Sequence, residues 1–164
     1  MRINILLLLI MGFVLIGCSD ASDDKASGLA KPYQENVAVA WTQASQGESP
    51  AMTCLQIGGT AARMVAEGKD KNNEARQAFE ACYVDAFVHY TNVLFAQDDN
   101  ADTESMSFNR ACTDFRRNLR SVLFTAGSEY ASKLDVDLED LNNQIREGVV
   151  EVVTLCPGYD NYFD

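Results

Sequence analysis

Residues 79–94 read FEACYVDAFVHYTNVL and contain the clearest helical pattern of the chain. Apolar side chains recur there in alternating steps of three and four residues, beginning with Phe79 and Cys82. This spacing places them on one face of an α-helix, which we expect to cover residues 71–97. The stretch therefore predicts a long amphipathic helix with a cysteine on its buried face.

The same periodicity recurs on both sides of this helix. Four further helices are expected, over residues 32–46, 50–68, 103–127 and 137–156. Ser49 before Pro50 is typical of a helix start, Asp137 is placed to cap the last helix, and Pro157-Gly158 ends it. No segment alternates as a strand does. The sequence predicts an all-α fold, an antiparallel helical bundle of four to five helices.

Two adjacent glycines, Gly58 and Gly59, interrupt the apolar face of the second predicted helix. Glycine is costly inside a helix, so it needs a structural reason there. Ala61 and Ala62 follow closely, and we expect the small residues to admit the backbone of another helix. A local break at the two glycines is the alternative.

The first 18 residues carry an export signal. Arg2 is followed by an apolar run over residues 3–16, which is shorter than the roughly 20 residues of a membrane-spanning helix. A basic start and a short apolar run are typical of a secretory signal peptide. The run ends in Leu15-Ile16-Gly17-Cys18, which closely resembles the lipobox of bacterial lipoproteins.

The lipobox resemblance implies a membrane anchor and a location. It implies cleavage after Gly17 and a diacylglycerol on the Cys18 thiol. Lipoproteins retained in the inner membrane usually carry Asp where this chain has Ser19, so we expect the periplasmic face of the outer membrane. The expected divisions are a signal peptide, a flexible lipidated tether rich in Ser, Asp, Ala and Gly, and the helical bundle domain, over residues 1–17, 18–31 and 32–164.

The four cysteines that remain are spaced for an antiparallel bundle. Facing residues of two such helices lie equally far from the turn, and the midpoints of successive cysteines fall at residues 68, 97 and 134, beside the predicted turns. We expect the sulfur atoms in about one layer. An even number of exported cysteines predicts two disulfides. The favoured pairing is Cys54–Cys82 with Cys112–Cys156, since short loops close first. The pairing Cys82–Cys112 with Cys54–Cys156 stays open.

The composition and motifs favour a noncatalytic protein. With 24 acidic against 13 basic residues the chain has a net charge of −11, which argues against nucleic acid as a partner. His89 is the only histidine, and we expect Asp85, one turn earlier, to accept its ring proton. No phosphate loop, nucleophile elbow or short Cys-x-x-Cys pair is present. We expect no catalytic residue, no metal site and no cofactor besides the lipid.

Two groups of residues are candidates for partner binding. The fourth predicted helix carries Arg110, Arg116, Arg117 and Arg120. These arginines either pair with acids of neighbouring helices or form a docking face, where arginine is enriched. Beyond the last helix lie Tyr159, Tyr162 and Phe163, which either fold back on the bundle or present a binding segment.

The function expected from these features is that of an adaptor that binds another envelope or secreted protein and is held to the membrane by its lipid. Helical, disulfide-bearing pilot lipoproteins of secretion systems are similar in general design. Such an adaptor should show a concave apolar strip between two helices. The alternative is an inhibitor or immunity protein that blocks a toxin or hydrolase with an acidic loop at residues 98–102 or with the C-terminal tail. An enzyme is the third candidate.

Overall fold

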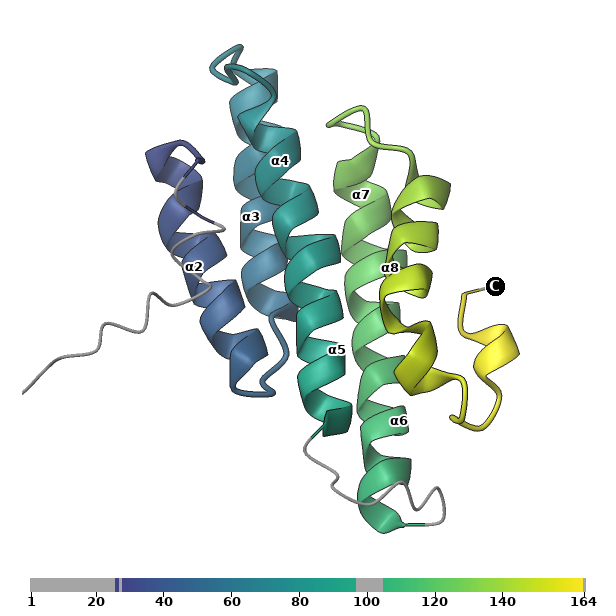
Figure 1. Cartoon of the computed structure of the whole chain (residues 1–164). Helices are drawn as coiled ribbons and strands as arrows, with labels where there is room; N and C mark the ends of the chain where they lie inside the picture. Colours follow the sequence, from purple (N-terminus) through teal and green to yellow (C-terminus); the bar gives the residue numbers. More distant parts are fainter. Residues whose placement is uncertain (1–25, 27, 97–104, 164) are drawn as a thin grey trace, which may run out of the picture.

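The computed structural model describes residues 26, 28–96 and 105–163, except for the side chains of residues 123–126. Helical rods account for nearly all of this part of the chain, and it contains no strand (Figure 1). The first two rods are α2 (Lys31–Ser45) and α3 (Ala51–Ala66). The third, which we call the central rod, is continuous and consists of α4 (Glu74–Glu80), the π-helical segment η1 (Ala81–Ala86) and α5 (Phe87–Ala96).

The fourth rod is built in the same way. It joins α6 (Met106–Leu119), a second π-helical segment η2 (Arg120–Gly127) and the short α7 (Ser128–Ala131). The fifth is α8 (Leu138–Val153), which is followed by the 3₁₀ turn η3 (Tyr159–Asn161). The all-α prediction of an antiparallel bundle of four to five helices is confirmed.

The helix ends follow their capping residues closely. The Asp137 side chain accepts a hydrogen bond from the backbone N–H of Glu139 at 2.8 Å, as predicted. The second helix begins at Ala51, one residue later than expected, with Pro50 at its N-cap. Ser105 caps α6 by accepting a bond from the backbone N–H of Phe108 at 3.0 Å.

The π-helical segments are a feature that the periodicity did not predict. A π turn bonds each residue to the fifth one along rather than the fourth, so it widens the buried face. In η1 this change buries Cys82, Tyr83 and Val84 in succession. The central rod therefore turns a broad surface toward its neighbours. It packs against α2, α3 and α8, while η1 and η2 lie against each other.

Small residues bring the first helices close together. Ala40, Ala44, Ala61 and Ala78 are fully buried between α2, α3 and α4. Helix α3 continues unbroken through its two glycines. The expectation that Gly58 admits a helix backbone is wrong, because the Tyr130 ring occupies the space where a Gly58 Cβ would lie. The neighbour is an aromatic side chain of α7.

Both disulfides have the favoured pairing. Cys54 bonds to Cys82 and Cys112 bonds to Cys156, with Cα–Cα distances of 5.4 and 5.6 Å. The first disulfide joins α3 to the central rod. The second joins α6 to the segment that follows α8, so it fixes the start of the C-terminal tail.

The prediction that all four sulfurs share one layer is wrong. Phe95 packs on Phe108, with 5.8 Å between ring centroids, and Asn118 bonds to Tyr90. The residues of α5 and α6 that contact each other therefore have their sequence midpoint several residues beyond residue 97. Cys112 therefore lies opposite a position about ten residues past Cys82, ~15 Å along the central rod. The midpoint rule assumed a tight turn, whereas α5 ends at Ala96 and α6 begins at Met106.

The bundle begins slightly earlier than predicted. Ala26 and Leu29, at the end of the expected tether, are buried against the bundle, and Gln34 donates a hydrogen bond to the Leu29 carbonyl at 2.6 Å. Residues 18–25 lie outside the described residues. Of the helices that the structure describes, none combines the length and the apolar character needed to cross a bilayer.

Candidate functional site

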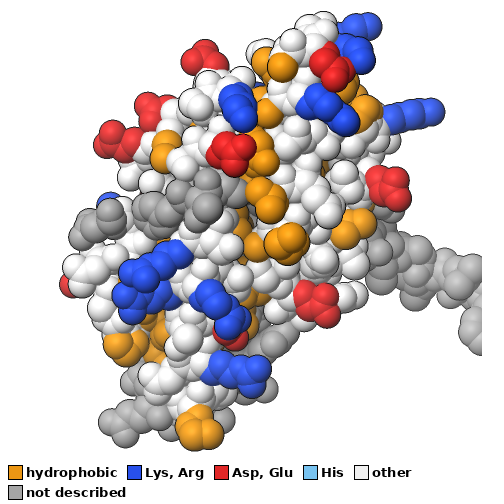
Figure 2. Space-filling view, turned by 180° about the vertical axis from the view of Figure 1, so that it is seen from behind, with side chains coloured by type: hydrophobic (Ala, Val, Ile, Leu, Met, Phe, Trp, Pro, Cys, Tyr) orange, Lys and Arg blue, Asp and Glu red, His pale blue; other side chains and the backbone are white. Residues whose placement is uncertain are grey.

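Helix α6 has one buried and one exposed side. Its buried side carries the apolar residues Phe108, Ala111, Cys112, Phe115 and Leu119. On the exposed side Arg110, Thr113 and Arg117 recur in steps of three and four, and Arg120, the first residue of η2, continues the series. We call Thr113 and the four arginines, Arg116 included, the arginine face. Figure 2 shows Lys and Arg side chains gathered over the part of the molecule where α6 runs.

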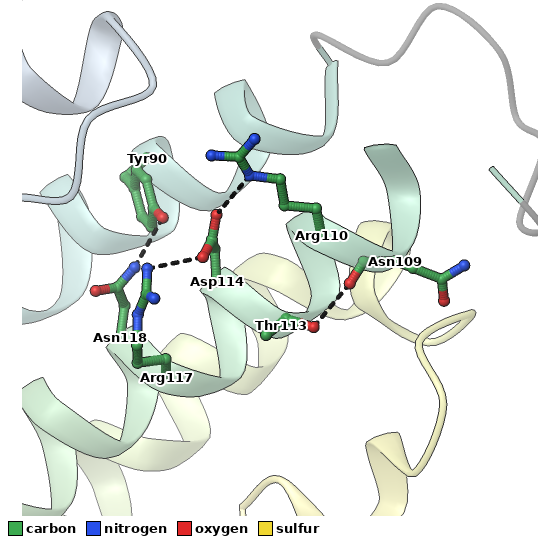
Figure 3. A network of polar contacts seen from close by, with 7 residues as sticks. All are labelled: Tyr90, Asn109, Arg110, Thr113, Asp114, Arg117 and Asn118. Atoms are coloured by element: carbon green, nitrogen blue, oxygen red, sulfur yellow. Dashed lines mark hydrogen bonds and ion pairs between the residues drawn. The ribbon is translucent and has the colours of Figure 1, made fainter. Parts of the chain in front are cut away.

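Asp114 lies between two of the arginines (Figure 3). One carboxylate oxygen is 2.7 Å from Nη2 of Arg117, and the other is 3.9 Å from Nε of Arg110. The three residues meet along one face of α6, because residues three and four apart on a helix are neighbours. The acid belongs to α6 itself, however, and not to a neighbouring helix. The pairing orients two guanidinium groups and leaves them in water, with side-chain exposures of 72 and 85%.

A hydrogen bond beside these ion pairs joins α6 to the central rod. Asn118 donates from Nδ2 to the hydroxyl oxygen of Tyr90 at 2.9 Å, as Figure 3 shows. Tyr90 is almost fully buried, and burial raises the pKa of its phenol above the ordinary value. The hydroxyl is thus neutral at physiological pH. The arginines point outward because the opposite, apolar side of α6 is buried, and this bond joins the same helix to the central rod.

The other two arginines have different surroundings. Arg116 lies over the Tyr162 ring, 5.5 Å from its centroid. Among the described residues no carboxylate pairs with Arg116 or Arg120, and both are exposed. Together with Thr113 and Arg117 they line a shallow hollow of about 400 Å³. Its wall is cationic, in a chain of net charge −11.

The C-terminal tail folds back on the bundle, which was one of its two predicted alternatives. The Tyr162 hydroxyl donates to the Pro157 carbonyl at 2.9 Å, and its ring packs 6.0 Å from that of Phe115. Tyr162 is buried by these contacts. Phe163 lies under Arg146 of α8, and Tyr159 contacts both rings of the tail. The fold thus brings two sequence candidates, Arg116 and Tyr162, together.

A groove that the sequence reasoning missed lies between α2 and α8. Its volume is about 590 Å³, and the central rod forms its floor. Trp41 comes from α2, Gln144, Glu147 and Gly148 from α8, and the central rod supplies Val84, Asp85, Val88, His89 and Asn92. A glycine inside α8 was the one available signal. A Cβ at Gly148 would lie only 2.7 Å from a methyl group of Val88, so glycine allows α8 to approach the central rod.

His89 forms one end of this groove. Its ring stacks on Trp41 at 5.0 Å, and its Nε2 lies 3.0 Å from the Ser45 hydroxyl oxygen. A serine beside a histidine is the first element of an acyl-transfer site. Ser45 ends α2, however, and the N–H groups of Gln46 and Gly47 already bond to carbonyls of that helix. The end of α2 near Ser45 presents backbone carbonyls, which accept hydrogen bonds, whereas an oxyanion needs hydrogen-bond donors.

Neither a metal site in the described residues nor a similarity to known proteins gives a further indication of function. Within the described residues no three His, Cys, Asp or Glu side chains gather as metal ligands would. The acidic loop at 98–102, expected for an inhibitor, lies outside the described residues. Comparison with protein-family models, curated proteins and solved structures gives no match for this chain.

Proposed function

We propose that the protein is a noncatalytic, lipid-anchored adaptor on the periplasmic face of the outer membrane, and that it binds a helix of another envelope protein. The observation that carries the proposal is the groove between α2 and α8. A concave strip framed by two helices, in which Trp41, Val84 and Val88 lie among polar residues, can receive an amphipathic helix.

The floor of the groove suits apolar anchors. Val84 and Val88 point into it from the central rod, and the Trp41 ring closes one side. A volume of about 590 Å³ accommodates several side chains of a docked helix. Burial of apolar surface there would supply the binding free energy, at about 25 cal/mol for each Å² removed from water.

The frame of the groove is held rigidly, which favours binding. The Cys54–Cys82 disulfide fixes the central rod two residues before Val84, and Asn92 donates to the Gly148 carbonyl of α8 at 3.3 Å. A preformed receptor loses little conformational entropy when its ligand arrives.

The edges of the groove specify the charge of the occupant. Asp85 on the central rod and Glu147 on α8 both line it, and both are exposed. A partner helix with Lys or Arg beside its apolar stripe would meet these carboxylates. The net charge of −11 would also speed the encounter with a basic segment.

Site-specific photocrosslinking in intact cells tests the proposal. A photoreactive residue replaces Gln144, which lines the groove, and in the matched control it replaces Gln56, which is exposed on α3. We expect one discrete adduct from position 144, none from 56, and loss of the adduct when Val88→Lys puts a charge on the floor. No adduct at 144, or equal adducts at both positions, would overturn the groove as the binding surface.

The anchor is tested separately. Cells grown with a labelled fatty acid should label the wild-type chain, and Cys18→Ser should abolish that label and release the protein from the outer-membrane fraction. A labelled Cys18→Ser chain, or an unlabelled wild type, would contradict lipidation at Cys18 without bearing on the groove.

A further inference from the structure

We infer that the arginine face of α6 is a second binding surface, distinct from the groove, and that it takes an acidic segment of a protein partner. The groove is lined by α2, the central rod and α8, and none of its residues belongs to α6. The inference therefore goes beyond the proposed function and stands or falls independently of it.

The first support is the balance of charge on this helix. Between residues 110 and 120 there are four arginines and one acid, Asp114, whereas the whole chain has 24 acidic and 13 basic residues. Exposed charges are screened over about 8–10 Å at physiological ionic strength. A group that touches α6 therefore senses the local positive charge more strongly than the distant acids.

The second support is the shape of the surface. The exposed stripe runs from Met106 to Arg120, which spans ~21 Å at the rise of an α-helix. Met106 is 88% exposed at its start, and the hollow of about 400 Å³ lies among Arg116, Arg117 and Arg120 at its other end. A helix or extended chain fits along such a stripe, and guanidinium groups bind carboxylates through paired hydrogen bonds.

The third support is that two of the four arginines, Arg116 and Arg117, are positioned before any ligand arrives. Asp114 holds Arg117 at 2.7 Å, and the Tyr162 ring lies beneath Arg116. Asn118 and the Cys112–Cys156 disulfide fix the helix that carries them. The guanidinium groups thus lose less freedom on binding than four unrestrained side chains would.

An acidic segment fits this surface better than an anionic membrane does. A bilayer is flat, so bringing α6 to it also brings the surrounding acids of a chain with a net charge of −11. A single peptide is narrow enough to contact the stripe and avoid those acids. The same reasoning favours a peptide over free phosphate, which would contact only the hollow.

The test uses the full mature domain and a defined probe. The probe is a fluorescent 14-residue helical peptide with glutamate repeated in steps of three and four, and its control carries glutamine at the same positions. We expect the glutamate peptide to bind and the glutamine peptide not to bind. Arg117→Glu with Arg120→Glu should weaken binding about tenfold or more. Arg63→Glu, at an exposed position of α3, should leave binding unchanged.

Three outcomes would overturn the inference. The first is no binding of the glutamate peptide at low salt. The second is equal loss with the Arg63 variant, which would indicate a general charge effect. The third is arginine-dependent binding to phosphatidylglycerol vesicles or inorganic phosphate that matches or exceeds peptide binding. Val88→Lys in the groove should not affect the peptide, which separates this test from that of the proposed function.

Discussion

The groove and the arginine face are built in opposite ways. The groove takes residues from three segments, around residues 41, 84–92 and 144–148, and mixes apolar side chains with polar and acidic ones. The arginine face lies on one continuous rod, over residues 110–120 at the end of α6 and the start of η2, and is basic. One surface exists only because distant segments meet, while the other needs little more than that α6 is helical.

Because of this difference, the two surfaces should respond to different changes in the fold. A change that moves α8 against the central rod should alter the groove and spare the arginine face. A change in how α6 is held should do the reverse. The variants below test that independence, and they are ordered by the expected loss of stability.

The largest effects are expected from the disulfides. Each double replacement by alanine, at Cys54 with Cys82 or at Cys112 with Cys156, should lower the free energy of unfolding by about 2–4 kcal/mol in urea denaturation. The two bonds close segments with sequence separations of 28 and 44 residues, so the entropic effects are of similar size.

Their functional effects should differ. Loss of Cys112–Cys156 frees the tail from α6 and should weaken binding of the acidic peptide, while the crosslink at Gln144 persists. Loss of Cys54–Cys82, beside the groove floor, should reduce that crosslink and spare the peptide. If each variant impaired both activities equally, the two surfaces would not be independent.

The next effect is expected at Gly148. Gly148→Val brings a side chain into the methyl groups of Val88, and such overpacking costs about 1–3 kcal/mol. Thermal unfolding followed by circular dichroism would show a lower Tm. The control is Gly59→Ala, a helical glycine whose added Cβ would meet only Tyr130 at an ordinary distance of 3.5 Å. A Tm for Gly148→Val at or above the wild-type value would contradict the close approach of α8.

A smaller effect is expected between the tail and the arginine face. Arg116 lies 5.5 Å from the centre of the Tyr162 ring, and such a pair with a solvent-exposed cation is worth about 0.5–1 kcal/mol. A double-mutant cycle with Arg116→Gln and Tyr162→Leu, measured by urea denaturation, should give a coupling energy of that size. Additive effects would show that the tail packs without help from Arg116.

The smallest effect is expected from Asp114→Asn. The ion pairs of Asp114 are at the surface, so their loss should change the free energy of unfolding by only a few tenths of a kcal/mol, about 0.5 kcal/mol at most. Removing the one acid of this face should nevertheless strengthen binding of the glutamate peptide in a fluorescence titration. Weaker binding would mean that the orientation of Arg117 matters more than the net charge.

Local patterns in the sequence were enough for several of these features. The spacing of apolar residues predicted five helices, Asp137 was recognised as a cap, and the even count of cysteines with short loops favoured the observed disulfides over one alternative pairing. The meeting of Arg110, Asp114 and Arg117 was also predictable, because residues three and four apart on a helix are neighbours. Each of these depends on residues close in the chain or on a count.

Other features required the tertiary structure. Three features depend on how side chains of different helices pack together. They are the π turns, the register of α5 against α6, and the Tyr130 ring against Gly58. The register of α5 against α6 places the two disulfides at different heights along the bundle, although the midpoints of the cysteines had suggested one layer. The return of Tyr162 to Arg116 is a further case, since the sequence left two alternatives for the tail.

The sequence by itself thus determined the helices and the basic stripe on α6, since each follows from local periodicity or from composition, and it narrowed the cysteine pairs to two sets, of which the structure has one. Only the tertiary structure decided that α2 and α8 flank the central rod with a groove between them. The physical reason is that helix register and contact depend on single steric fits, such as Gly148 against Val88, and residues 60 positions apart in the chain carry no local sign of such a fit.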